Sequence, residues 1–257
     1  MTLRTSSMGL LLASLAGAAC AQSPKDVTDG ELALLPPFCY DTMGMRYGSK
    51  DSNRSPRASH WEGLMGQSFW AMHHYCWAKI NQRRIFAPGT DPKYRIGLLG
   101  GVVGDLGFVI NNSPPDFIML PEIYSALGEV ELLRKNPAAA NGHFNTARKL
   151  KPSYPPPYQL WSEYLLSIGK KDEAKALLKL GLEHNSTAVS LQALYNKLGG
   201  DPKMIAPVVT NVPNAPIEPP ATPAAAASRA AADPAAAPAS APALPAEAGS
   251  SPQSGAR

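Results

Sequence analysis

The sequence lacks several features that would mark a nucleic-acid-binding, membrane-spanning or zinc-binding protein. Its 24 lysines and arginines are nearly balanced by 20 aspartates and glutamates, so the net charge of +4 excludes a strongly basic nucleic-acid binder. Outside the N-terminal segment, no apolar run approaches the roughly 20 residues that span a bilayer. The sequence has three cysteines and no His-Glu-x-x-His pattern, so it shows none of the residue spacings that are typical of zinc sites.

Catalytic motifs are also absent. We find no nucleophile elbow and no serine with triad partners at familiar spacing. Glu129 and Glu131 are interpreted as solvated helix-surface carboxylates, not as an acid–base pair. We therefore expect that the protein is not an enzyme and has no resident cofactor.

The first 21 residues have the pattern of a signal peptide. Arg4 precedes an apolar stretch over 8–19 that is too short to anchor in a membrane, and Ala19-Cys20-Ala21 fits a small-x-small cleavage site. A buried N-terminal helix is the structural alternative. The form of this signal peptide and the Ala/Pro-rich C-terminal tail, described below, suggest a bacterial protein that is exported to the periplasm or cell envelope.

Cys20 leaves a second interpretation of this segment open. A lipobox places a large aliphatic residue three positions before the cysteine, and here that residue is Gly17, so the match is partial. If Cys20 carries a lipid, the mature protein is a membrane-anchored lipoprotein.

The C-terminal segment 207–257 has no aromatic residue, 11 prolines and 18 alanines. Such a composition buries too little apolar surface to offset the entropy of ordering, so we predict a disordered tail. We interpret it as a flexible spacer or tether; the alternative is a ligand for a proline-recognition domain.

Two cysteines remain after the signal peptide. In an oxidising compartment an even pair usually forms a disulfide, so we predict a Cys39–Cys76 bond. Two free buried thiols, or a reactive thiol at Cys76 beside His73 and His74, are the alternatives.

The segment from 121 to 188 repeats with a period of 34 residues. Unit 121–154 carries Tyr124, Leu127, Gly128, Ala140, Phe144, Ala147 and Pro152; unit 155–188 carries Tyr158, Trp161, Ser162, Ala174, Leu178, Gly181 and Ser186 at the same positions. Small residues at three of these positions let two antiparallel helices approach, and large residues fill the space between them. The pattern resembles the tetratricopeptide repeat, with departures at Ser162, Gly181 and Ser186.

This resemblance implies an all-α fold: a short right-handed superhelical stack of tetratricopeptide-like helix pairs. Two units are too few to bury their faces alone, so other helices must extend the stack. We predict a capping helix over 189–198 and a repeat domain over 59–206. The segment 22–58 is predicted to be an irregular, extended region pinned by the disulfide.

Upstream of the repeats, two further helical segments are predicted. Residues 59–86 have apolar side chains at helical spacing, which favours one long or two broken helices. Residues 91–112 form a degenerate helical unit. Its glycines recur at three- and four-residue spacing, which favours close backbone approach; no phosphate-binding motif follows them: Gly97, Gly100, Gly101, Gly104 and Gly107.

The family resemblance also implies a binding groove, lined by the first helix of each repeat. Carrying the family's groove positions onto this sequence selects eight residues: Glu122, Ser125, Glu129, Leu132, Pro156, Gln159, Glu163 and Leu166. These positions hold three carboxylates and no lysine or arginine, which suggests a basic or neutral partner segment. The alternative is an ordinary solvated surface.

His73 and His74 offer a different candidate site. Adjacent helical residues point about 100° apart, so a partly buried, hydrogen-bonded pair is the plain interpretation and we predict no metal site. The alternative is a haem or soft-metal site that uses either histidine with a methionine. The expected function is an adaptor or scaffold that binds another envelope protein, including as an assembly factor of an envelope complex; a haem- or metal-binding accessory protein is second. No nucleic-acid partner is expected.

Overall fold

Helices joined by short connections make up the part of the chain that the structure describes. The computed structural model describes residues 24, 26–48 and 53–208, and over these ranges it contains helices and no strand. The signal peptide, Cys20 and nearly all of the tail predicted over 207–257 lie outside the described residues. The all-α prediction is confirmed for the described part.

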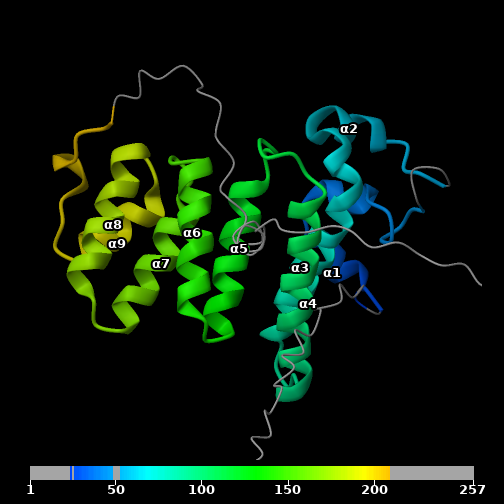
Figure 1. Cartoon of the computed structure of the whole chain (residues 1–257), viewed down its shortest axis with the longest axis horizontal. Helices are drawn as coiled ribbons and strands as arrows, with labels where there is room; N and C mark the ends of the chain where they lie inside the picture. Colours follow the sequence, from blue (N-terminus) through cyan, green and yellow to red (C-terminus); the bar gives the residue numbers. More distant parts are fainter. Residues whose placement is uncertain (1–23, 25, 49–52, 209–257) are drawn as a thin grey trace, which may run out of the picture. The chain divides into compact units, whose positions relative to one another are not determined.

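The long helices follow one another as packed hairpins (Figure 1). They are α3 (Met72–Ile85), α4 (Pro92–Asn111), α5 (Leu120–Leu133), α6 (Pro137–Leu150), α7 (Pro156–Ser167), α8 (Lys171–His184) and α9 (Val189–Lys197). Each contacts the next, and α5 also contacts α7, which contacts α9. Contact between helices two apart means that neighbouring hairpins stack on each other.

Proline and side-chain caps mark where these helices begin. Four of them, α4 to α7, carry a proline in their first turn, where the missing N–H is not needed. Asp91 caps α4 by accepting from the backbone N–H groups of Lys93 and Tyr94 at 2.9 and 3.0 Å. Much of the proline outside the tail therefore starts helices.

The small residues of the two repeat units do allow close helix contact. A Cβ added to Gly128 of α5 would lie 2.5 Å from the ring of Phe144 in α6. A Cβ on Gly181 of α8 would lie 2.8 Å from both Tyr158 and Leu191. No side chain larger than glycine fits these two positions without displacing a buried neighbour, so this part of the expectation is confirmed.

The same expectation is wrong for four of the five glycines of α4. A Cβ on Gly97, Gly100, Gly101 or Gly107 would meet nothing within 4 Å. Here the spacing of glycines did not signal a backbone contact, because the neighbouring helices leave room beside them.

Most of the buried apolar side chains belong to one of two clusters. The first extends from Leu32 to Val130 and takes in the disulfide, α3, α4 and α5. The second joins α7, α8 and α9 around Tyr158, Leu178 and Leu191, and is closed by Ile205. Capping helix α9 contributes Leu191 and Tyr195, as its sequence pattern indicates.

The N-terminal region is more helical than the extended segment expected over 22–58. Helix α1 (Asp29–Ala33) begins with a capping box: Glu31 N–H donates to the Thr28 hydroxyl, and Thr28 N–H donates to the Glu31 carboxylate. The 3₁₀ helix η1 (Pro37–Asp41) follows. Thr28 and Glu31, three positions apart, therefore start a helix inside the segment that was expected to be extended.

Residues 59–86 form broken helices, as predicted. Helix α2 (Ala58–Met65) ends at Gly66, where φ is +61°, and the 3₁₀ helix η2 (Gly66–Ala71) leads into α3. A positive φ is favourable for glycine alone, which explains why the helix breaks here. The last 3₁₀ turn, η3 (Pro202–Met204), follows α9.

Candidate functional site

The residues predicted to line a groove come from α5 and α7. Glu122, Ser125, Glu129 and Leu132 lie on α5; Pro156, Gln159, Glu163 and Leu166 lie on α7. Ser125 is buried, so it is unavailable to a partner. The others are partly or fully exposed, and the acidic ones contact side chains of α3 or of each other.

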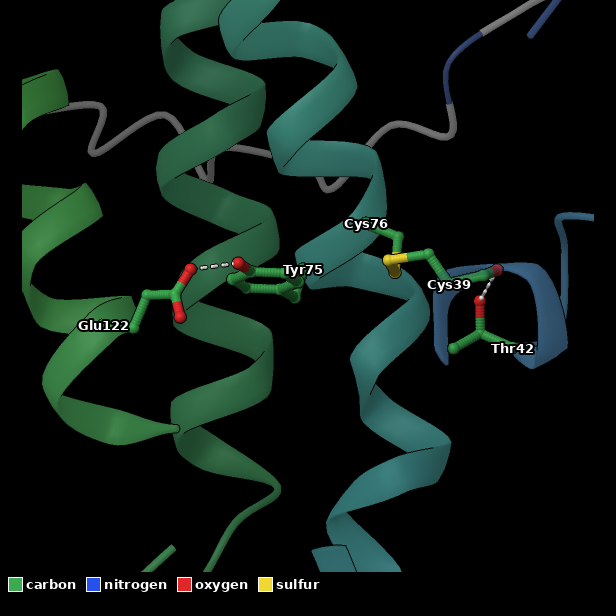
Figure 2. The surroundings of a disulfide bond; sticks show 5 residues. All are labelled: Cys39, Thr42, Tyr75, Cys76 and Glu122. Carbon is green, nitrogen blue, oxygen red and sulfur yellow. Dashed lines mark hydrogen bonds between the residues drawn. A yellow bond between two sulfur atoms is a disulfide. The ribbon is translucent and has the colours of Figure 1, made fainter. Parts of the chain in front are cut away.

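Glu122 is held by a tyrosine of α3. Figure 2 shows Tyr75 reaching from α3 toward Glu122, and its hydroxyl donates a hydrogen bond to the carboxylate. Burial, and then the Glu122 charge, raise the pKa of Tyr75 far above its usual range. The same two causes raise the pKa of Tyr154 to about 12. Glu122 therefore links α5 to α3 within the fold, and its carboxylate is already hydrogen-bonded to Tyr75 before any partner binds.

Glu129 is in a different situation. Its carboxylate accepts from Gln82 of α3 at 3.5 Å, which is a long hydrogen bond. Burial raises its pKa, the ammonium of Lys79 opposes that rise, and the carboxylate of Glu163 adds to it. Glu163, which is exposed, accepts from Gln159 at 3.0 Å. Two carboxylates from α5 and α7 thus lie close enough to repel each other.

We call this polar region the first-helix face. Its partly or fully exposed side chains are Lys79, Glu122, Glu129, Gln159 and Glu163, and the buried Tyr75 and Gln82 donate hydrogen bonds to Glu122 and Glu129. The eight predicted positions hold no lysine or arginine, but α3 adds Lys79, whose charge lowers the pKa of Glu129. The 34-residue repeat begins at residue 121, so α3 lies outside it.

His73 and His74 are buried and hydrogen-bonded, as predicted, but their rings lie closer together than the 100° separation of adjacent helical residues suggests. They are 4 % and 8 % exposed, and their ring centroids are 4.3 Å apart. Trp77 packs edge-on against both rings at 4.7 Å, and Phe108 of α4 lies 4.0 Å from His74. Packing of side chains from α3 and α4 therefore brings the two imidazole rings together, although the helix backbone directs the two residues apart.

Each imidazole has its Nδ1 atom occupied. His73 Nδ1 is 2.8 Å from the carbonyl oxygen of Trp70, and His74 Nδ1 is 2.8 Å from Asp105 Oδ1. Burial, and then His74, lower the pKa of His73 to about 4. Asp105 is fully buried, burial raises its pKa, and its Oδ2 has no hydrogen-bond partner.

A cavity of about 290 Å³ adjoins His73. Met43, Trp70 and Phe108 are among the side chains that line it. Within the described ranges, no three His, Cys, Asp or Glu residues gather as a potential metal-binding group. This arrangement does not provide the four ligands of a structural zinc site.

The predicted disulfide is present. Cys39 of η1 and Cys76 of α3 are bonded, both are fully buried, and 37 positions separate them in the sequence. Figure 2 shows Cys76 reaching toward Cys39 on the side of α3 away from Glu122. The Thr42 hydroxyl donates to the Cys39 carbonyl at 2.9 Å, which holds η1 beside the bond. The reactive-thiol alternative is thereby excluded.

Four polar residues of these sites were missed from the sequence: Tyr75, Lys79, Gln82 and Asp105. A signal existed for Asp105, because it is the one acidic residue in the apolar stretch of α4. No comparable signal marks Tyr75 or Lys79, because their roles depend on how α3 packs beside α5.

Comparisons with known proteins give no family assignment. No protein-family model, no curated protein and no solved structure matches this chain. Within the residues that the structure covers, no helix combines the length and hydrophobicity needed to cross a bilayer.

Proposed function

We propose that the protein is a tetratricopeptide-like adaptor, exported to the bacterial periplasm or envelope, that binds a basic or neutral segment of another protein through the first-helix face. Stacked helical hairpins with close contacts at Gly128 and Gly181 support the architectural part of the proposal. Assembly of an envelope complex is the process that best suits such an adaptor.

The observation that carries the binding proposal is the placement of half-buried Glu129 on α5 and exposed Glu163 on the neighbouring α7. Burial raises the pKa of Glu129 and the charge of Glu163 raises it further, so each carboxylate disfavours the charged form of the other. The charge of Lys79 lowers the pKa of Glu129 more than the charge of Glu163 raises it, and burial keeps the pKa raised. A lysine or arginine from a partner would further stabilise the charged form of Glu129, and that gain would favour the complex.

The direct test uses synthetic peptides that differ only in charge: lysine-containing, neutral and glutamate-containing versions of one backbone. We expect the order lysine, neutral, glutamate in affinity for the intact protein, measured by calorimetry at physiological salt. The Glu129→Lys, Glu163→Lys double variant should bind the lysine peptide at least about tenfold more weakly, equivalent to roughly 1.4 kcal/mol.

The matched control is Asp172→Lys, which reverses an exposed charge on α8 away from this face. It should change the affinity less than about twofold, because a single charge on another surface acts weakly through screened solvent. A chain ending after Val208 tests the tail separately. Equal binding by the double variant and the intact protein, or tightest binding of the glutamate peptide, would contradict the proposal.

A further inference from the structure

The cavity beside His73 has a buried hydrogen-bond acceptor in its wall. His73 is 4 % exposed, and its Nδ1–H donates to the backbone oxygen of Trp70, because a carbonyl oxygen only accepts. Since burial, and then His74, lower the pKa of His73 to about 4, its imidazole is neutral at pH 7 and Nε2 keeps a lone pair. No described residue donates to this lone pair, and Nε2 is not one of the fully buried atoms that lack a partner, so it faces open space. A molecule in the cavity can therefore supply the missing donor.

The walls around His73 are mainly apolar. Trp70, Phe108 and Met43 line the cavity, together with the exposed amide side chains of Gln67 and Asn112. None of the described residues that line it carries a charge at pH 7. A charged ligand would lose hydration there without gaining an opposite charge, whereas an aromatic ring can pack against Trp70 and Phe108. The cavity therefore favours an uncharged aromatic ligand.

Contacts within the protein hold these walls in place. The indole N–H of Trp70 donates to Glu62 at 2.6 Å, and Arg54, paired with Glu62 at 2.9 Å, lies over the Trp70 ring at 5.7 Å. The side-chain amide of Asn112 donates to the Phe108 carbonyl oxygen at 2.8 Å. A ligand that enters has few side chains left to order, which lowers the entropic cost of binding.

The size of the cavity suits a molecule of one or two rings. Its volume of about 290 Å³ lies at the lower end of the range for small-molecule sites, about 300–1,000 Å³. Two other cavities, one beside Phe117 and one beside Leu99, have only exposed polar side chains in their walls. The buried acceptor on His73 distinguishes this cavity from both.

We propose that this cavity binds a small, uncharged aromatic molecule that donates one N–H or O–H hydrogen bond to Nε2 of His73 and packs its ring against Trp70 and Phe108. Indole represents this chemical class. The site uses residues outside the first-helix face, so the failure of either proposal leaves the other standing.

Indole and benzofuran are matched probes for the test, because benzofuran has nearly the same shape and an oxygen in place of the N–H donor. Each is titrated by calorimetry into the intact, disulfide-bonded protein at pH 7. We expect one indole per chain, bound at least about tenfold more tightly than benzofuran, because benzofuran leaves the Nε2 acceptor without a partner.

The place of binding is tested by NMR of protein with ¹³C-labelled methionine methyl groups. Indole should shift the methyl resonance of Met43, which lines the cavity, through the field of its aromatic ring. Met43→Leu assigns this resonance. The methyl resonance of Met204, which is 82 % exposed and lies after α9, should stay in place.

His73→Asn tests the acceptor itself, because its amide keeps a donor for Trp70 and removes Nε2. We expect the ratio of indole to benzofuran affinity to fall below about twofold, while the melting temperature stays near that of the intact protein. His60→Asn, at an exposed histidine, is the matched control and should keep the original ratio.

Any of four results would overturn the proposal: no indole bound by the intact protein, benzofuran bound as tightly as indole, an unmoved Met43 resonance in the indole complex, or an unchanged ratio in folded His73→Asn. If His73→Asn loses its fold, the affinity ratio and the Met43 resonance of the intact protein decide.

Discussion

Reduction of the Cys39–Cys76 bond should lower the free energy of unfolding by about 4 kcal/mol. The bond joins residues 37 positions apart, and closing a loop of this length removes about 13 cal/mol/K of entropy from the unfolded chain in the chain-entropy treatment. At 25 °C this corresponds to about 4 kcal/mol, a large fraction of the stability of an ordinary domain.

The folded state should change little on reduction. Phe38 beside Cys39 packs against Trp61 and Tyr75, with ring centroids at 6.1 and 5.8 Å. The hydroxyl of Thr42 donates to the Cys39 carbonyl. These contacts keep η1 in place without the covalent bond. The loss of stability should therefore come from the greater entropy of the reduced, unfolded chain.

Guanidinium unfolding followed by tryptophan fluorescence, with and without a phosphine reductant, measures this loss. Cys20→Ser is the parent, so that the third cysteine cannot exchange with the pair. The control is the Cys39→Ala, Cys76→Ala variant, whose stability should not respond to reductant. A loss below about 1 kcal/mol on complete reduction would refute the loop-entropy reasoning.

Two further predictions concern packing and pH. Gly128→Ala should destabilise the protein by about 1–3 kcal/mol, because the new methyl group meets the buried Phe144 ring. Gly142→Ala, on an open face of α6, should stabilise it by about 0.5–1 kcal/mol, and urea unfolding of both variants measures the two effects. Arg84 donates to the Glu31 carboxylate and lowers the pKa of Glu31 to about 2 from 4.5. The resulting stability, about 1–2 kcal/mol after allowance for solvent, is present above pH 4.5 and is lost as the pH falls toward 2. Unfolding titrations from pH 5.5 to 2.5 should show this loss in the parent and not in Glu31→Gln.

The sequence predicts the local part of this architecture well. Gly128 and Gly181, with large residues facing them, predict helix hairpins because the small residues needed for close helix approach recur at a fixed spacing. The pair Cys39 and Cys76 likewise predicts its bond from compartment and parity. Helix starts at Asp91 and at prolines follow from backbone chemistry that acts over a few residues.

Contacts between distant segments could not be predicted in the same way. The hydrogen bond from Tyr75 to Glu122 joins α3 to α5 across 47 positions, and no sequence pattern in either helix predicts it. His73 and His74 were expected to diverge, since helix geometry alone places them apart. Their rings meet because Trp77 and Phe108 enclose them, which depends on the packing of α3 against α4.

Helix α3 connects all of these features, and this shapes how the two proposals must be tested. Its residues bond to η1 through Cys76, to α5 through Tyr75 and to α4 through His74. Because three different elements hold it, a substitution that shifts α3 would disturb the first-helix face and the histidine pair together. Loss of peptide binding in the Glu129→Lys, Glu163→Lys variant, with helix content and melting temperature unchanged, would therefore separate a lost contact from a displaced helix. Loss of peptide binding together with a lower melting temperature would indicate movement of α3 instead.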